Sequence, residues 1–139
     1  MVQVLMGLRG SGKTKQMIDL INQAASCESG HVIAIERGVK LSGEIRARTA
    51  RLLDTKEYDI RSYQVLRGFI TGLYAGNYDI SHVFIDSLFK IAECEDITEF
   101  ERFIDWLFTF HKAHGVKFTI TVSADQAVAT EKIRQCFMV

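Results

Sequence analysis

Proline is absent from the 139-residue chain, and cysteine occurs only three times. The three cysteines lie far apart, at Cys27, Cys94 and Cys136, and no two of them form a C-x-x-C pair. This spacing argues against a zinc knuckle and against a disulfide framework. Because unpaired cysteines are typical of a reducing compartment, we expect a cytoplasmic protein.

The chain also lacks net charge and long apolar runs. Lys and Arg together number 17, as do Asp and Glu, so no overall field attracts nucleic acid or anionic lipid. No apolar run approaches the length of a membrane span, and an apparent strand at residues 2–6 leaves no room for a secretory signal. With 47% hydrophobic residues, we expect one globular domain over residues 1–139 and no membrane partner.

Residues 7–14 match the phosphate-binding pattern G-x-x-x-x-G-K-[ST], and a strand-like run precedes them while a helix-like pattern follows. Glycines allow the backbone to turn with positive φ and to approach a ligand closely. Successive N–H groups and the start of the helix then form an anion site. The lysine reaches the β- and γ-phosphates of a nucleotide and the threonine hydroxyl binds Mg²⁺. The predicted nucleotide-binding residues are Gly7, Leu8, Arg9, Gly10, Ser11, Gly12, Lys13 and Thr14, with Lys13 also catalytic and Thr14 a metal ligand.

Strand-like and helix-like segments alternate along the rest of the chain. We expect strands at 2–6, 31–36, 82–86 and 117–122, and a short edge strand at 58–61. Helices are expected at 12–25, 43–53, 63–75, 96–114 and 124–135, the fourth of them with a capping box of Asp96 and Glu99. Such alternation favours an α/β fold, a mainly parallel five-stranded sheet within a three-layer α/β/α sandwich.

A second motif, His82-Val83-Phe84-Ile85-Asp86-Ser87, is an apolar strand that ends in an acid. In P-loop enzymes an Asp in this place holds Mg²⁺, so Asp86 is the second predicted metal ligand. The alternative is that Asp86 caps the following helix, and both roles are compatible.

Three stretches, GLRGSGKT at 7–14, VIAIE at 32–36 and HVFIDS at 82–87, resemble the P-loop NTPases and, within them, the RecA-like ATPases. The resemblance implies Walker A and Walker B motifs, a P-loop NTPase fold with strand order 3-2-4-5-1, and Mg²⁺ and ATP as cofactors. It also implies that Glu36 is the catalytic carboxylate that polarises the attacking water, although a loop role for Glu36 stays open. Ser87, not an acid, follows Asp86, so the Asp-Glu pair of many ATPases is absent.

Hydroxyls on the last strand, at Thr119, Thr121 and Ser123, are placed either near the γ-phosphate or in the core. The aromatic face of helix 96–114, widened by Trp106 and Phe110, is either a homo-oligomer or protein-partner surface or a broad buried face. Nucleic acid is possible but not favoured as a partner, because no aromatic residues lie among the nearby basic residues. Those basic residues are Arg37, Lys40, Arg46, Arg48 and Arg51; Arg37, Arg46 and Arg134 are candidate arginines for a neighbouring subunit's site.

The sequence thus favours a small P-loop NTPase that binds Mg²⁺–ATP and hydrolyses it. Two alternatives stay open. One is a nucleotide-dependent binding or switch module with little turnover. The other is a small nucleotide or small-molecule kinase, which requires a second pocket beside the loop.

Overall fold

Five strands form one sheet in which each neighbouring pair is parallel. The computed structural model describes residues 1–45 and 49–138. The strand order is β1-β5-β4-β2-β3, which reads 3-2-4-5-1 from the β3 edge, so β5 separates β1 from β4. The strands are β1 (Val2–Gly7), β2 (His31–Glu36), β3 (Ala50–Asp54), β4 (Ile80–Ile85) and β5 (Lys117–Ser123).

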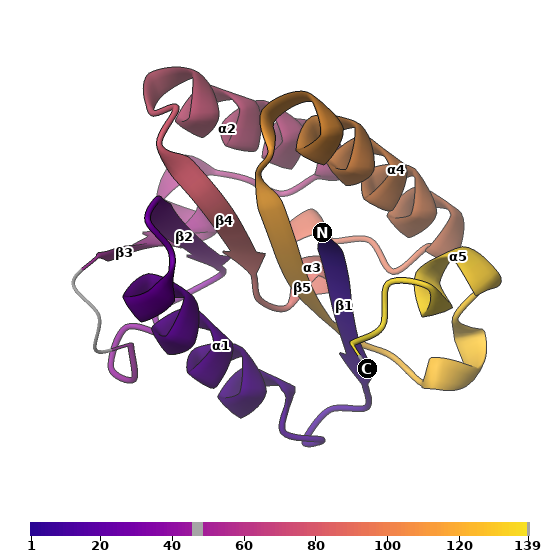
Figure 1. The fold of residues 1–139 in the computed structure, drawn as a ribbon. Helices are drawn as coiled ribbons and strands as arrows, with labels where there is room; N and C mark the ends of the chain where they lie inside the picture. Colours follow the sequence, from indigo (N-terminus) through magenta and orange to yellow (C-terminus); the bar gives the residue numbers. More distant parts are fainter. Residues whose placement is uncertain (46–48, 139) are drawn as a thin grey trace.

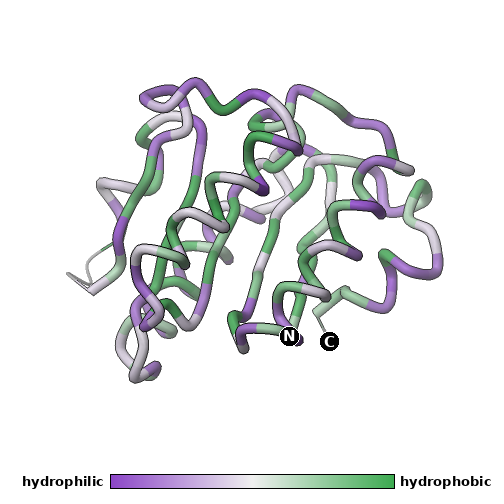
Figure 2. Tube along the Cα trace, turned by 90° about the horizontal axis from the view of Figure 1, so that it is seen from above, coloured by the Kyte–Doolittle hydropathy of each residue, from purple (hydrophilic) through white to green (hydrophobic). Residues whose placement is uncertain are grey.

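Helices cover both faces of the sheet, giving the expected three layers (Figure 1). One face packs against α1, and the other packs against α2 and α4. Figure 2 shows hydrophobic positions concentrated along the strands and hydrophilic ones mostly on the outer turns. The helices are α1 (Lys13–Cys27), α2 (Tyr63–Gly76), α3 (Leu88–Ala92), α4 (Ile97–His114) and α5 (Glu131–Arg134), with 3₁₀ turns at Thr55–Tyr58 and Gln126–Val128.

Strand alternation decides which side chains share the α1 face. Successive side chains of a strand point to opposite faces. Val32 and Ala34 of β2 and Phe84 of β4 pack in the α1 core, whereas Ile33 and Ile35 join the opposite core. By the same alternation, Glu36, the last residue of β2, and Asp86, the residue after β4, lie on the α1 face at the carboxyl edge of the sheet.

Helix α4 begins and ends close to the residues that its sequence predicts. Asp96 caps its first turn by accepting a hydrogen bond from the Glu99 N–H, and Gly115 follows its last turn with φ 72°. Its aromatic face is mostly internal, because Phe110 is 7% exposed and Trp106 packs against Phe103 and Phe110.

Three predicted elements are wrong. Residues 50–53, expected within a helix, belong to β3, which pairs with the edge of β2. The predicted helix 43–53 also includes residues 46–48, which lie outside the described part of the chain. Residues 58–61 are not a strand, because the chain turns there after β3. In place of a helix over 124–135, the chain has a 3₁₀ turn and the four-residue α5.

The segment after α5 returns to β1 instead of extending a helix. The Val4 N–H donates to the Cys136 carbonyl at 2.8 Å, and Val4 forms a parallel bridge with Phe137. This pairing satisfies part of the free edge of β1, which explains why the last residues leave the helical conformation.

Among the described residues, no helix combines the length and the apolar character that crossing a bilayer requires.

Candidate functional site

Residues 8–12 join β1 to α1 in a loop that leaves helix N–H groups available. Gly10 and Gly12 have φ angles of 85° and 88°, a backbone conformation that residues with a side chain rarely adopt. Gly12 is the N-cap of α1 and provides no side-chain cap, so N–H groups of the first turn keep their donor capacity. The positive end of the helix dipole lies at the same place, so the loop is suited to an anion.

Lys13 lies along the inside of this loop. Its Nζ donates to the Leu8 carbonyl at 3.0 Å and lies 3.4 Å from Ser11 Oγ. Burial lowers the pKa of Lys13, while the Asp86 carboxylate opposes that shift.

Asp86 is fixed by a hydroxyl from the neighbouring strand. It is 4% exposed, and its Oδ1 accepts a hydrogen bond of 2.7 Å from Thr121 Oγ1. Thr121 Oγ1 in turn accepts from the Ser87 N–H at 2.7 Å, which orients the hydroxyl proton toward Asp86. The Asp86 side chain caps no turn of α3; its backbone N–H donates to the Ile35 carbonyl.

Glu36 lies on the strand beside Asp86 and is also buried, at 4% exposure. Its Oε2 accepts a hydrogen bond of 2.9 Å from the Leu41 N–H, which holds the loop of residues 37–41 against the sheet. Burial raises the pKa of Glu36; the Leu41 N–H opposes this, and the charges of Asp86 and Asp54 add to it. The carboxylate lines a separate small cavity of about 140 Å³ rather than the cavity beside Lys13.

A cavity of about 320 Å³ adjoins the phosphate-binding loop at the carboxyl edge of the sheet. Its described walls include no carboxylate and five cationic side chains, so the cavity favours a ligand with several negative charges. Thr14, Thr121 and Ser87 add side-chain hydroxyls. The cationic side chains are Arg9, Lys13, Lys15, Lys40 and Lys90.

A second cavity, of about 530 Å³, continues from the first and shares Arg9, Ser87, Lys90 and Ser123 with it. Its remaining walls are Phe89, Glu93 and Glu95, so this cavity has two carboxylates where the 320 Å³ cavity has none among the described residues. Ser87 has φ 57°, an uncommon backbone conformation for a residue with a side chain, and lines both cavities.

The donor set beside the loop fits a magnesium ion bound to phosphates. Mg²⁺ prefers oxygen ligands and commonly takes one or two from the protein. Thr14 offers a hydroxyl, and within the described chain Asp86 Oδ2 makes no hydrogen bond, which leaves it available. No group of three or more His, Cys, Asp or Glu side chains among the described residues forms a separate metal centre.

The structure places five of the ten predicted site residues around one cavity. Loop residues Arg9, Gly10, Gly12, Lys13 and Thr14 line the cationic cavity, whereas Gly7 and Ser11 line a cavity on the other side of the loop, with Lys13 between the two. Leu8 contributes its carbonyl to Lys13 and exposes 61% of its surface.

The sequence analysis weighed the hydroxyls of the last strand but missed three lysines. Thr121 and Ser123 line the cationic cavity, whereas Thr119 bonds His82 Nε2 in the sheet interior. Lys15, Lys40 and Lys90 were not predicted as wall residues. Lys15 directly follows the predicted loop, and Lys40 and Lys90 each lie four residues after a predicted acid, Glu36 or Asp86, so their positions are the signal that indicates them. Arg46 and Arg48 lie outside the described residues.

A comparison with known protein families found no match, and none of the curated proteins matches the sequence. Among solved structures, the chain is similar to a KaiC-like protein from the hyperthermophilic archaeon Pyrococcus horikoshii OT3. The TM-score is 0.68 at 18% sequence identity, over 96% of this chain. At this identity the likeness shows a shared α/β fold and no more. The chain spans 66% of the length of that protein.

Proposed function

We propose that this protein is a P-loop NTPase that binds Mg²⁺–ATP and hydrolyses it. The observation that carries the proposal is the cationic cavity, in which five basic side chains and an uncapped helix start meet Thr14 and Thr121, and the Thr121 hydroxyl donates to Asp86 behind the cavity wall. A polyphosphate satisfies that combination of charge and donors, and the KaiC-like fold supports the proposal.

The proposed reaction is phosphoryl transfer to water. The water oxygen bonds to the γ-phosphorus while the bond from that phosphorus to the β–γ bridging oxygen breaks, and Glu36 accepts the water proton. The loop N–H groups and the Lys13 ammonium stabilise the charge that develops on the phosphate oxygens. Thr14 and Asp86 would hold Mg²⁺, which supplies further charge neutralisation when it is bound. The raised pKa of Glu36 suits a base, because a more basic carboxylate accepts a proton more readily.

A small-molecule kinase is the second candidate, and the 530 Å³ cavity favours it over a switch module. The shared walls place that cavity next to the phosphate site, where an acceptor hydroxyl would compete with water. In this case ATP consumption without an acceptor is slow, and Glu93 or Glu95 takes the acceptor proton.

Nucleotide binding tests the proposed site directly. We expect Lys13→Ala to weaken Mg²⁺–ATP binding by about 10- to 100-fold, the loss of one charge-assisted hydrogen bond of about 1.5–3 kcal/mol. Isothermal titration calorimetry measures the affinity. Lys112→Ala, which removes an exposed lysine from the last turn of α4, is the matched control and should bind as the wild type does. Equal affinity in Lys13→Ala and wild type contradicts the site.

A further inference from the structure

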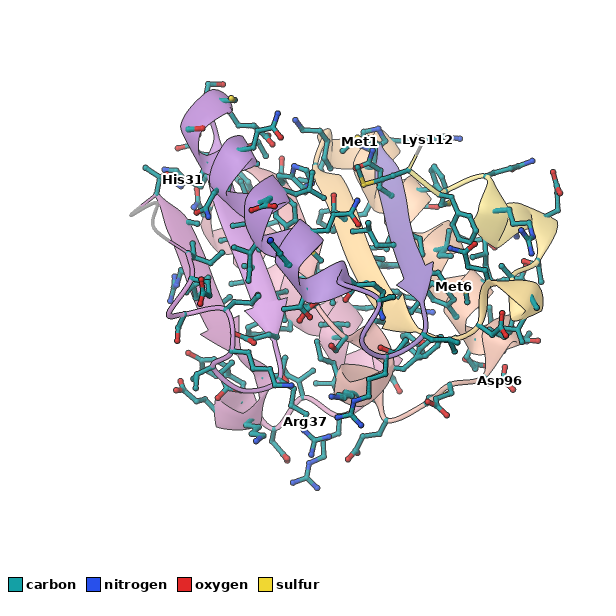
Figure 3. All side chains as sticks on the ribbon, turned by 90° about the horizontal axis from the view of Figure 1, so that it is seen from below. Met1, Met6, His31, Arg37, Asp96 and Lys112 are labelled. Carbon is teal, nitrogen blue, oxygen red and sulfur yellow. The ribbon has the colours of Figure 1, made fainter. Side chains whose placement is uncertain are left out.

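A pocket of about 260 Å³ lies beyond the end of β3, apart from the two cavities beside the phosphate-binding loop. Three of its walls are cationic, Arg37, Lys56 and Arg61, against a single acid, Asp59. Figure 3 shows Arg37 at the carboxyl edge of the sheet, beyond the ends of the strands.

The loop after β3 separates charges of opposite sign into two cavities. Glu36, Asp54 and Glu57 line the neighbouring 140 Å³ cavity, which has no cationic wall among the described residues. Asp54 is engaged there, because its Oδ1 accepts from the Gly38 N–H at 2.7 Å and from the Lys56 N–H at 3.0 Å. The cationic pocket therefore keeps a positive balance despite the acids nearby in the sequence.

Thr55 supplies the observation that points to a ligand. It lines the cationic pocket, is 1% exposed, and its Oγ1 has no hydrogen-bond partner among the described residues. A buried hydroxyl without a partner destabilises the folded chain, so such groups are rare unless something binds them. A phosphate oxygen in the pocket would accept a hydrogen bond from this hydroxyl.

The cations keep donor capacity for a ligand. Lys56 makes no ion pair with the described residues, and the Arg61–Asp59 pair is largely exposed and uses Arg61 Nε. Arg37 donates through Nη1 to the Lys90 carbonyl at 3.2 Å, and the same nitrogen lies 3.7 Å from Glu93. Its other nitrogen donors have no partner among residues 1–45 and 49–138.

From this combination we infer that the pocket formed by Arg37, Thr55, Lys56 and Arg61 is a second anion site, which binds the phosphate group of a small molecule or inorganic phosphate. This pocket is separate from the proposed nucleotide site. It lies beyond the end of β3, whereas the loop of residues 8–12 lies beyond the end of β1, and these two strands are at opposite edges of the sheet. Arg37 links the two regions, because its partners Lys90 and Glu93 both line the 530 Å³ cavity.

The test is a titration of the full-length, ¹⁵N-labelled protein with inorganic phosphate, at constant ionic strength set with chloride and with Mg²⁺–ADP present to occupy the loop. Amide signals of residues 55–61 and of Arg37 should shift and saturate. Thr55→Val keeps the shape of the side chain and removes only the hydroxyl, so it should preserve or raise thermal stability while weakening phosphate binding about 10-fold. Lys56→Gln should weaken it too, and Lys112→Gln is the control that should not.

Unchanged phosphate affinity in Thr55→Val, or shifts at 55–61 that chloride alone reproduces, would overturn the inference. Shifts confined to residues 8–14 would overturn it as well and would leave the proposed nucleotide site intact. Saturable shifts at 55–61 in a protein that fails to bind Mg²⁺–ATP would support this site and contradict the proposed function. A parallel titration with glycerol 3-phosphate distinguishes the two ligand sources. Tighter binding of glycerol 3-phosphate than of inorganic phosphate indicates a phosphorylated small molecule, and the reverse order indicates the free ion.

Discussion

Thr121 shows how one side chain connects two strand ends at the site. Its hydroxyl donates to the Asp86 carboxylate and accepts from the Ser87 N–H, so it fixes both the proposed metal ligand and the start of α3. Thr121 is 1% exposed, and water therefore has little access to replace it.

We expect Thr121→Val to cost about 1–3 kcal/mol of unfolding free energy, because it leaves a buried carboxylate oxygen and an N–H without partners. It should also weaken binding of Mg²⁺–ATP more than binding of metal-free ATP, because Asp86 loses its orientation. Denaturant unfolding and calorimetry measure the two effects. Thr121→Ser keeps the hydroxyl, so it should retain most of the unfolding free energy and most of the Mg²⁺–ATP affinity. Equal stability and equal affinity in the Val and Ser variants would contradict the proposal that Thr121 orients Asp86.

At this scale the sequence predicts residue identities better than their contacts. The spacing from Gly7 to Thr14 and the acid after β4 identify the loop and Asp86, because each role requires a particular residue type at a particular strand end. The Leu41 N–H that holds Glu36 was not predictable, since it depends on how the 37–41 loop folds back. The catalytic role of Glu36 stays a prediction.

A buried polar cluster joins three elements at the opposite edge of the sheet. His82 of β4 lies 2.7 Å through Nδ1 from Glu28, the residue after α1, and 2.8 Å through Nε2 from Thr119 of β5. Lys117 forms an ion pair of 2.9 Å with the same Glu28. The cluster holds the end of α1 against β4 and β5, away from the proposed nucleotide site.

This cluster predicts acid sensitivity. Burial lowers the pKa of His82 below its ordinary 6.5, although the Glu28 bond opposes the shift. The unfolded chain therefore takes up a proton more readily than the folded one, and the stabilisation present above pH 6.5 is lost as the pH falls through the lowered pKa. The pKa of Glu28 is also lowered, because its bonds to Lys117 and His82 outweigh burial, so its contribution is lost in the same direction.

We expect the melting temperature to fall between pH 7 and pH 5, and to fall less in His82→Gln, whose amide keeps a donor and an acceptor but does not titrate. His114→Gln, at the exposed end of α4, is the control and should follow the wild type. If the melting temperature falls with pH equally in wild type and His82→Gln, His82 is not the cause of the acid sensitivity.

Element prediction succeeded where local pattern and tertiary context agree. Helix α4 has a capping residue, a stripe of apolar residues and a terminal glycine, and it spans nearly the predicted residues. Strand β3 was not predicted, because its five residues have no strong strand pattern of their own. Pairing with the edge of β2 determines their conformation. Local propensity is a weak guide where pairing with a distant strand decides the conformation.

Across the whole molecule, charge is balanced in number and uneven in place. Equal counts of 17 acids and 17 bases give no net field, yet the cavity beside the phosphate-binding loop has five cationic walls and no described carboxylate. Composition therefore did not favour a general polyanion binder, and it did not reveal the local concentration of cations. That concentration arises because the parallel strands bring the segments after β1, β2 and β4 to one edge of the sheet.

The most direct test of the central claim is phosphate release from Mg²⁺–ATP by wild type and Glu36→Gln, with nucleotide affinity measured on the same samples. Gln retains an oxygen to accept the Leu41 N–H, so the variant should fold and bind ATP as the wild type does. We predict measurable release by the wild type without an added acceptor, and a loss of at least about 100-fold in the variant, the range typical of a general base. Binding without release in either protein would contradict hydrolysis, and absence of binding in both would contradict the nucleotide site itself.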